Sequence, residues 1–495
     1  MKYKLFFVIL LSSTFAICQS DKKDDLKYSD EEKLAYFLEL TDSLREKGNN
    51  TGMAIAIIYN NKLIYKNSFG YRNVEEKLPV TNNTLFEIAS CTKAFTGMIA
   101  SRLVKQKKLN WNDKVVKYLP DFTLKDKYAA QNATLLDLLT HRVGVGQHYY
   151  MIYGPDFDIS ELLERVKHLS FDGSFREKFL YNNFMYAVAG LVEEKAAGKS
   201  WNELIRTEIF EPIGMNNSYT RFDEFMKNKE YTLSYSNNGV TRIPQKGNDT
   251  YAPAGSITSS INDMAKWLKM LVNSGTINKN EFISKKEFEY LTSPLTVRYA
   301  SSKVFYGIGW EVDLENGTIY HDGRNPGQSS RIQFNSEKGF GIVILTNQET
   351  DLQTLLVLYA INIFLKDDFN RMPELDKIIE KRANPEAAAK EIKRYSILSE
   401  TKELINDIEG TYNHPAYGNL RLYFENSNEL IFKYYDFIGT SKYNSNMSFT
   451  AFTNHYKGDY KFNFEVEKDK NGKINSVKVP IPYTKPLHFK KVFKK

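Results

Sequence analysis

The stretch FEIASCTKAFTGMIASRLV, residues 86–104, decides the fold because its apolar side chains have the spacing of a buried helix. Phe95 and Ile99 are four residues apart, and further apolar residues continue the same face. Ser90 and Lys93 lie three residues apart at the entrance of this helix, and side chains with that spacing share one face. The sequence therefore predicts a hydroxyl and an amine side by side where a buried helix begins.

Two physical effects favour catalysis by this pair. The N-terminus of a helix has unpaired N–H groups and a positive potential, which lower the cost of an oxyanion. The same potential, together with burial, disfavours a charged lysine, and lowering a lysine pKa from ~10.4 to ~7 requires about 4–5 kcal/mol. A neutral Lys93 could then take the proton of Ser90. The alternative is that Ser90 is an ordinary N-cap and Lys93 is exposed, and the pair alone does not decide between the two.

Two further motifs carry polar groups. A Tyr-x-Asn motif at Tyr181 and Asn183 runs directly into a long amphipathic helical pattern, unlike the other copies of this motif in the chain. His321-Asp322-Gly323 is the only His-x-Gly, and it follows a predicted strand, as expected where a substrate lies against the backbone. A structural role for this histidine is the alternative.

No metal or cofactor is expected. His141 and His148 do not have a metal-ligand spacing, and the chain has no His-Glu-x-x-His motif and no cysteine cluster, so we interpret both histidines as structural. A Gly-x-Ser-x-Gly motif is also missing, which argues against the nucleophile elbow of an α/β-hydrolase.

The chain has 495 residues, enough for a large domain and a smaller one. Residues 1–18 carry two lysines, a short apolar run and small residues before Cys18, which is typical of an export signal peptide, and a polar tail follows over residues 19–30. We expect an exported protein, periplasmic or extracellular, with a lipid tether on Cys18 as the alternative to a soluble one. Cys18 and Cys91 are the only cysteines, so no internal disulfide is expected after cleavage.

The order of the patterns predicts an α+β fold over residues 31–366. Two early strands meet at a turn at Asn60-Asn61, a mostly helical region follows, and three or four strands and an apolar helix return after about residue 300. We expect one antiparallel sheet whose halves come from the two ends of this domain, flanked by helices and carrying a helical subdomain. Residues 367–404 predict a helical linker, and residues 405–495 predict a small all-β domain.

Positive charge is concentrated near the C-terminus. Without Lys2 and Lys4 the basic residues still exceed the acidic ones, and the excess lies within residues 401–495. The segment HFKKVFKK fits a contact with anionic polymers of the cell envelope or a solvated chain end, and the solvated end is favoured. No pattern predicts binding to nucleic acid.

In chain order, Ser-x-x-Lys, Tyr-x-Asn and His-x-Gly resemble the motifs of the serine β-lactamase and penicillin-binding-protein family, in the branch nearest the class C enzymes and the D-peptidases. The resemblance extends over about residues 35–365, through segments such as LLDLLTHRVGV, PAGSITSSINDMAKWL and YGIGW. It implies a β-lactamase/transpeptidase-like fold and a serine hydrolase that acts through an acyl-enzyme without metal or cofactor. The module that begins GTYNHPAYGNLRL resembles a small β domain of unknown role that often trails such hydrolases.

The resemblance also implies roles for the motif residues. Ser90 would be the acylated nucleophile and Lys93 its base or proton relay. Tyr181 would exchange protons with the leaving group and with the attacking water, and Asn183 would orient the substrate amide or carbonyl. The segment 321–323 would form the wall strand of the pocket.

The resemblance also implies an oxyanion hole made by the backbone N–H groups of Ser90 and of Arg324, which directly follows Gly323. Two residues depart from the family pattern. His321 replaces the lysine of β-lactamases and is mostly neutral at pH 7, so it should hold a β-lactam carboxylate more weakly. Arg324 stands where a small residue is more usual, and we hypothesise that it reaches a substrate carboxylate.

The His321 departure favours a D-peptidase, a D-aminopeptidase or an esterase over an antibiotic-resistance enzyme. The expected substrate is a peptide or amide with D-residues, from cell-wall material, or a small ester. β-Lactamase activity is one alternative, and a non-catalytic binding or sensing protein that keeps the pocket is another.

Overall fold

The computed structural model describes residues 28–152, 157–247, 249–373, 377, 395–398, 401, 403, 405, 407–426, 428–455, 458–482 and 484–493. The expected signal peptide, Cys18 and most of the expected polar tail and helical linker lie outside these residues. Across the described part of the chain, no helix combines the length and the apolar character that crossing a membrane requires.

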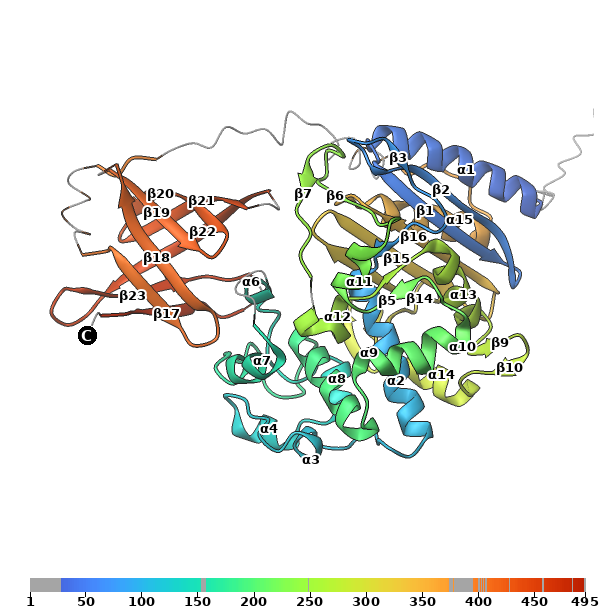
Figure 1. Cartoon of the computed structure of the whole chain (residues 1–495), viewed down its shortest axis with the longest axis horizontal. Helices are drawn as coiled ribbons and strands as arrows, with labels where there is room; N and C mark the ends of the chain where they lie inside the picture. The colour runs from blue at the N-terminus through green and yellow to red at the C-terminus, as the bar shows by residue number, and fades with distance from the viewer. Residues whose placement is uncertain are drawn as a thin grey trace, which may run out of the picture.

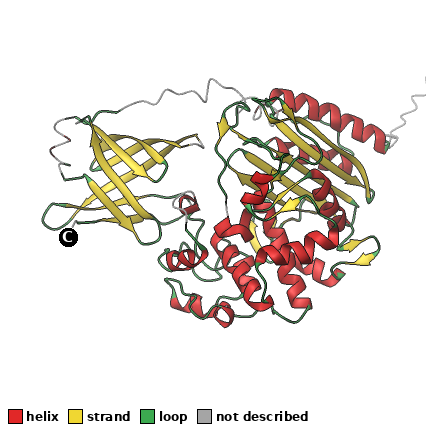
Figure 2. Ribbon diagram, viewed as in Figure 1, coloured by secondary structure: helices red, strands yellow, loops and turns green. Residues whose placement is uncertain are grey.

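A nine-stranded antiparallel sheet forms the centre of the larger part of the molecule (Figures 1 and 2). Its order is β11-β12-β13-β14-β15-β16-β1-β2-β3, and β1 pairs with β16, so the two ends of this part of the chain meet in the middle of the sheet. This confirms the predicted sheet. The strands are β1 (Gly52–Tyr59), β2 (Lys62–Asn73), β3 (Leu78–Pro79), β11 (Thr296–Tyr299), β12 (Val304–Tyr306), β13 (Glu311–Asp313), β14 (Thr318–Asn325), β15 (Gln328–Asn335) and β16 (Phe340–Thr346).

Both faces of the central strands are covered by helices. On one face, α1 (Asp30–Lys47) and α15 (Leu352–Lys366) pack on the alternate residues Met53 and Ile55 of β1. On the other face, α13 (Ile261–Val272) packs on β1 and β16. A strand that is buried on both sides needs apolar residues at every position, which explains why β1 reads as a continuous apolar run.

The helix expected from the start of the segment 86–104 begins later than predicted. Phe86–Glu87 form β4, which pairs with β8 (Thr258–Ser259), and a 3-10 turn, η1 (Ala89–Cys91), leads into α2 (Thr92–Lys105). The pairing with β8 is a long-range contact, which overrides the local helical spacing. All residues of α2 from Thr92 to Ser101 are buried, so this helix lies inside the helical subdomain rather than on its surface.

The remaining helices and short strands between β3 and β11 form the helical subdomain and its edges (Figure 1). They are α3 (Val115–Tyr118), α4 (Lys127–Asn132), α5 (Leu135–Leu139), α6 (Tyr149–Ile152), α7 (Ile159–Val166), α8 (Asn183–Ala197), α9 (Trp201–Ile205), η2 (Arg206–Phe210), α10 (Glu211–Ile213), β5 (Ser218–Tyr219), α11 (Phe222–Lys227), β6 (Ser234–Tyr235), β7 (Arg242–Ile243), η3 (Asp249–Tyr251), α12 (Ala252–Gly255), β9 (Thr276–Ile277), β10 (Asn280–Glu281) and α14 (Lys285–Leu291).

The C-terminal all-β module is a closed eight-stranded barrel. The pairing of β17 with β24, with Tyr412 opposite Lys491, closes it, and stacked rings such as Phe449 and Phe464 fill its interior. Closure leaves no unpaired strand edge. The strands are β17 (Gly410–His414), β18 (Gly418–Glu425), β19 (Glu429–Tyr434), β20 (Phe437–Ser445), β21 (Ser448–His455), β22 (Gly458–Lys468), β23 (Ile474–Val479) and β24 (Leu487–Lys491).

The barrel contacts the helical subdomain through the segment that contains α6. Tyr150 of α6 packs against barrel rings, with centroids 5.7 Å from Phe437 and 4.8 Å from Phe462. The buried His148 places Nδ1 3.0 Å from the hydroxyl of Tyr417. These contacts combine apolar burial with a specific hydrogen bond, so the barrel is docked on the larger part of the molecule.

Candidate active site

Ser90 lies in η1, directly in front of the buried helix α2. The preceding residue, Ala89, has φ of 47°, a left-handed conformation that costs energy in a residue with a side chain. On the other side, β14 passes very close to this turn. A Cβ on Gly323 would lie 2.1 Å from the carbonyl oxygen of Ile88, so only glycine allows the strand this approach.

The amine of Lys93 is held by three fixed oxygen atoms. Its Nζ is 3.0 Å from Ser90 Oγ, 2.6 Å from Asn183 Oδ1 and 2.8 Å from the carbonyl oxygen of Ala254. The lysine is fully buried and forms no ion pair with a described carboxylate. The arrangement differs from the alternative in which Ser90 is an N-cap and Lys93 points into water, because the lysine faces the serine in the interior.

Burial lowers the pKa of Lys93 well below its ordinary value, and the charge of Arg298 acts in the same direction. A neutral amine has two N–H donors and one lone pair. Asn183 Oδ1 and the Ala254 carbonyl oxygen can only accept, so they take the two donors. The lone pair is then left for the hydroxyl proton of Ser90, which is the geometry of a general base.

Tyr181 contacts the same oxygen from another direction. Its hydroxyl donates to Ser90 Oγ at 2.9 Å, and burial raises the pKa of Tyr181, so it holds its proton at neutral pH. The side chain of Asn182 caps α8 by accepting from Met185 N at 3.0 Å, which fixes the end of the helix beside Tyr181. The ring of the buried His141 packs at 4.5 Å from the Tyr181 ring.

His321 is buried in β14 and does not point freely into the pocket. The Tyr306 hydroxyl lies 3.2 Å from its Nε2, and its Nδ1 lies 2.6 Å from the carbonyl oxygen of Asp322. Burial lowers the pKa of His321 well below its ordinary value. The imidazole is therefore neutral near pH 7, as the sequence-based prediction assumed.

The two charged residues after His321 are already paired. Asp322 accepts both of its hydrogen bonds from Arg331 Nη1, at 2.8 and 2.9 Å. Arg324, about half exposed, pairs with Asp351 beside the start of α15. A substrate carboxylate that binds Arg324 would therefore compete with Asp351.

These residues border a cavity of about 610 Å³ that opens at Ser90. Ser90, Tyr181, Asn183, His321, Asp322 and Arg324 all line it, and Lys93 and Gly323 lie directly behind its wall. The structure thus brings together every predicted site residue. Among the described residues, no group of three or more His, Cys, Asp or Glu side chains is arranged to hold a metal ion.

The sequence analysis missed several residues of the pocket wall. Arg298 of β11 and Glu311 of β13 form an ion pair of 2.6 Å in this wall, and the Arg298 guanidinium lies 5.8 Å from the centre of the Tyr181 ring. Gln147 contributes from the segment before α6. The sequence offered only the segment YGIGW, next to Glu311, as a motif near this ion pair. The ion pair itself could not be predicted, because it joins residues of two different strands.

Comparisons with known proteins give a consistent result. A family model described as Beta-lactamase matches residues 37–360. Protein flp of Staphylococcus aureus is 27% identical over 320 residues, which cover 63% of this chain and 62% of that protein. A protein named unguisins hydrolase ungD', from Aspergillus campestris, is 26% identical over 332 residues, which cover 63% of this chain and 61% of that protein. The chain therefore spans less than two thirds of the length of these curated relatives.

A solved structure has the same fold. The octameric penicillin-binding protein homologue from Pyrococcus abyssi matches with a TM-score of 0.60 and 21% sequence identity, over 92% of this chain and 100% of that chain. At this identity the likeness concerns the fold alone.

Proposed function

The chain belongs to the beta-lactamase family, a family of serine hydrolases, and we propose that its Ser90 is acylated by peptides or amides with D-residues or by small esters. The observation that carries this proposal is the placement of two proton-transfer groups on one hydroxyl. Lys93 Nζ and the Tyr181 hydroxyl lie 3.0 and 2.9 Å from Ser90 Oγ. The relative from Aspergillus campestris, which is named a hydrolase, supports the reaction class.

In the acylation step, the neutral amine of Lys93 takes the proton of Ser90 while Oγ forms a bond to the substrate carbonyl carbon. Lys93 and Tyr181 both contact this oxygen, so the proton can pass to the leaving group through the Tyr181 hydroxyl as the bond to that group breaks. In deacylation, water attacks the ester, its proton passes to the same groups, and Ser90 regains its hydrogen. The backbone N–H groups of Ser90 and Arg324 are the proposed donors to the oxyanion.

The charges of the pocket support a substrate other than a β-lactam. The neutral His321 offers no full positive charge, and the two pocket arginines, Arg298 and Arg324, are each paired with a carboxylate. A substrate carboxylate would have to displace one of these partners. A neutral amide or ester avoids that cost.

Hydrolysis of p-nitrophenyl acetate by the full chain tests the proposal. The wild type should release p-nitrophenol in a burst as Ser90 is acylated, and Ser90→Ala should abolish the burst. Mass spectrometry of the intact protein should show an acyl adduct only in the wild type. Equal rates for the two proteins would favour the non-catalytic binding protein.

The substrate class can be separated with two further probes. A panel of D-amino-acid peptides and esters should leave an adduct on Ser90 when the class is correct. A fluorescent penicillin should label Ser90 stably if the protein acts as a wall peptidase, and its rapid turnover would indicate a β-lactamase. An absence of labelling would indicate an esterase or aminopeptidase.

We also propose that the protein is exported after removal of residues 1–18. N-terminal sequencing of the protein recovered from the host envelope would test this. The alternative, a lipid tether, requires cleavage just before Cys18, so that Cys18 becomes the first residue of the mature chain. The lipid would then appear as a mass increase of that chain and would place the protein at a membrane surface.

A further inference from the structure

A second cavity, of about 480 Å³, lies where the barrel meets the helical subdomain. Ten described residues line it, of which seven are lysine or histidine and none is aspartate or glutamate. They come from both parts of the molecule, from the region of α4 and α7 on one side and from β17 and β24 on the other (Figure 1). The cavity, called the basic cleft below, is lined by residues that include Lys125, Lys167, His168, His414, Lys490 and Lys491.

Much of the positive charge in the basic cleft is not neutralised. Lys125 and Lys490 are exposed and form no ion pair or side-chain hydrogen bond with a described residue. Lys491 donates to the backbone carbonyl of Asp407, and the Asp407 and Glu409 carboxylates also act on its charge. Among the lysines of the cleft, Lys167 has a carboxylate partner in Glu164, outside the lining. Of the four lysines in the lining, Lys125 and Lys490 therefore bring positive charge that no described carboxylate neutralises.

The field of these charges is felt inside the cleft. The pKa of His414 is lowered to about 4, first by burial and then by positive neighbours that include His168 and Lys125. His414 is therefore neutral at pH 7, and its Nδ1 accepts from Ala416 N at 3.1 Å, so its proton resides on Nε2. His488, the remaining histidine of the lining, contacts Glu467 at 3.1 Å. The described lining of the cleft thus offers donors, and the acidic partners of Lys167 and His488 lie outside it.

We propose that the basic cleft binds a soluble polyanion that carries two or more phosphate groups, held between the helical subdomain and the barrel. A hollow lined by one sign of charge focuses its potential and concentrates counter-ions of the opposite sign. Lysine binds phosphate as a point charge from many directions, which suits a ligand whose charges are spread over several groups. Because the lysines are distributed over both parts of the molecule, a single carboxylate or monophosphate would engage only a few of them.

Titration of the full chain with inorganic tripolyphosphate by isothermal calorimetry tests this proposal. The wild type should bind with a stoichiometry of one, and its affinity should fall as the salt concentration rises. The double variant Lys125→Glu/Lys490→Glu should bind at least about tenfold more weakly, because two attractive charges become repulsive. Both side chains are exposed and have no ion-pair partner among the described residues, so folding should be unaffected, which circular dichroism checks.

The matched control is Lys470→Glu/Lys473→Glu, which makes the same charge change in the exposed turn between β22 and β23. It should bind tripolyphosphate like the wild type. Equal weakening in both double variants would mean a non-specific charge effect and would overturn the proposal. Binding of orthophosphate as tight as that of tripolyphosphate would contradict a ligand with several phosphate groups.

A membrane surface is the other source of clustered phosphates. Vesicles of phosphatidylcholine with 30% phosphatidylglycerol test it, beside pure phosphatidylcholine vesicles. Binding to the anionic vesicles without binding to tripolyphosphate would overturn the assignment of a soluble ligand. Neither Lys125 nor Lys490 lines the active-site cavity, so hydrolysis of p-nitrophenyl acetate should be unchanged in the variant. The test is therefore independent of the proposed enzyme activity.

Discussion

Lys93 shows how burial and hydrogen bonding together prepare a base. The helix interior disfavours its charge, while two acceptor oxygens still bind the neutral amine and aim its lone pair at Ser90. A lysine exposed at the same helix end would stay charged at neutral pH, so it could not accept the proton of Ser90. The reactivity of the pair therefore depends on the depth at which α2 begins, and not only on the three-residue spacing.

The pH dependence of kcat/KM for p-nitrophenyl acetate should report this lysine. We expect activity to rise as Lys93 loses its proton, at a pH well below the ordinary lysine pKa of 10.5, because burial lowers the pKa of Lys93. His321→Gln should leave the position of this rise unchanged, because His321 is already neutral there. A rise that moves with the His321 substitution would assign the titration to the histidine. Lys93→Arg, which cannot lose its proton, should lower kcat/KM by about 10²–10⁴-fold.

Glu193 of α8 is a buried carboxyl group that makes the stability of the fold depend on pH. It is fully buried, and neither of its carboxyl oxygens has a hydrogen-bond partner among the described residues. Burial raises the pKa of Glu193 well above its ordinary 4.5. The folded state therefore holds the proton more tightly than the unfolded state, and the stability that this provides is complete below pH 4.5 and declines as the pH rises.

Glu193→Gln should remove this decline, because the amide does not titrate. Relative to wild type, the free energy of unfolding of the variant should increase from about pH 5 upward, by up to about 1.4 kcal/mol per pH unit while the folded group stays protonated. Urea denaturation at pH 5 and at pH 8 measures the difference, with the exposed Glu315→Gln as control. A difference between the variant and wild type that does not depend on pH would contradict the assigned titration.

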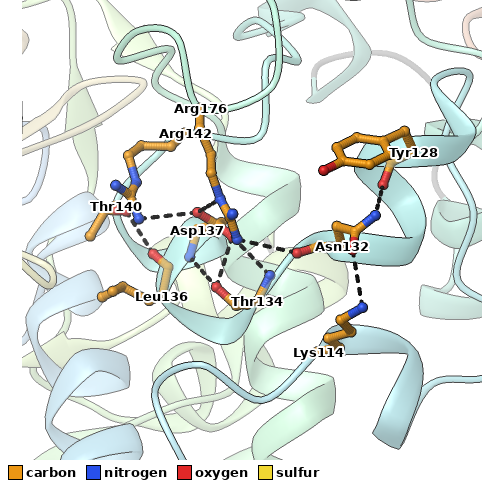
Figure 3. Close-up of polar contacts among 9 residues, drawn as sticks. All are labelled: Lys114, Tyr128, Asn132, Thr134, Leu136, Asp137, Thr140, Arg142 and Arg176. Carbon is orange, nitrogen blue, oxygen red and sulfur yellow. Dashed lines mark hydrogen bonds and ion pairs between the residues drawn. The ribbon is translucent and has the colours of Figure 1, made fainter.

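At the scale of elements, the short helix α5 is anchored by a buried carboxylate (Figure 3). Asp137 accepts from Arg176 at 2.9 and 2.7 Å and from Arg142 at 3.1 Å, and it completes a capping box with Thr134. The Asp137 side chain is completely buried. These bonds tie α5 to the segment around residue 176, which leads directly to Tyr181.

Asp137→Asn should lower the free energy of unfolding by about 3 kcal/mol at pH 7, because it leaves two arginines facing an uncharged group. Its hydrogen bonds, those from Arg176 above all, outweigh burial and lower the pKa of Asp137 below its ordinary 3.8. The contribution is therefore present above pH 3.8 and is lost as the pH falls through the folded value, so wild type and variant should converge at pH values below that folded pKa. The exposed contact between Lys114 and Asn132 in the same view is the control, and Lys114→Ala should change stability by less than about 0.5 kcal/mol.

The strands show what the sequence can predict about the fold. The hairpin of β1 and β2 follows from its turn, since Asn60 and Asn61 both adopt positive φ, of 50° and 61°, as asparagine tolerates. The central strands follow from their continuous apolar runs. The edge strand β11 and its neighbour β12 were not predicted, because TVRY and VFY are too short and too mixed in character to separate from a loop.

The site, like the fold, could be predicted only where its residues belong to a local sequence pattern. Ser90, Lys93 and Tyr181 are carried by short motifs that keep their order along the chain, so they could be selected from sequence. The Ala254 carbonyl that orients Lys93 leaves no trace in residue type. Arg298 reaches the pocket only because β11 joins the edge of the sheet, and such long-range pairing has no local signal.

At the scale of the whole molecule, the barrel holds one wall of the active-site cavity in place. Asp172 accepts from Gly146 N at 2.9 Å and from the barrel residue Lys485 N at 2.5 Å, and His148 contacts Tyr417 in the barrel. Gln147, between the two anchored residues, lines the cavity. The sequence predicted the module but not its docking. The contacts of the barrel with His148 and Asp172 join residues more than 250 positions apart, and the Asp172 bonds go to backbone N–H groups, which every residue type except proline has.

Tyr417→Phe tests this connection. The variant removes the hydroxyl that contacts the buried His148 Nδ1, so we expect a loss of about 1–3 kcal/mol in the free energy of unfolding. Since Gln147 is adjacent, KM for peptide substrates that fill the cavity should rise severalfold, while acylation by the small p-nitrophenyl acetate should be unchanged. Tyr434→Phe is the matched control, because the Tyr434 hydroxyl contacts the Tyr417 carbonyl oxygen within the barrel, at 3.2 Å. An equal rise of KM in both variants would show that general loosening of the barrel, rather than its contact with His148, shapes the cavity.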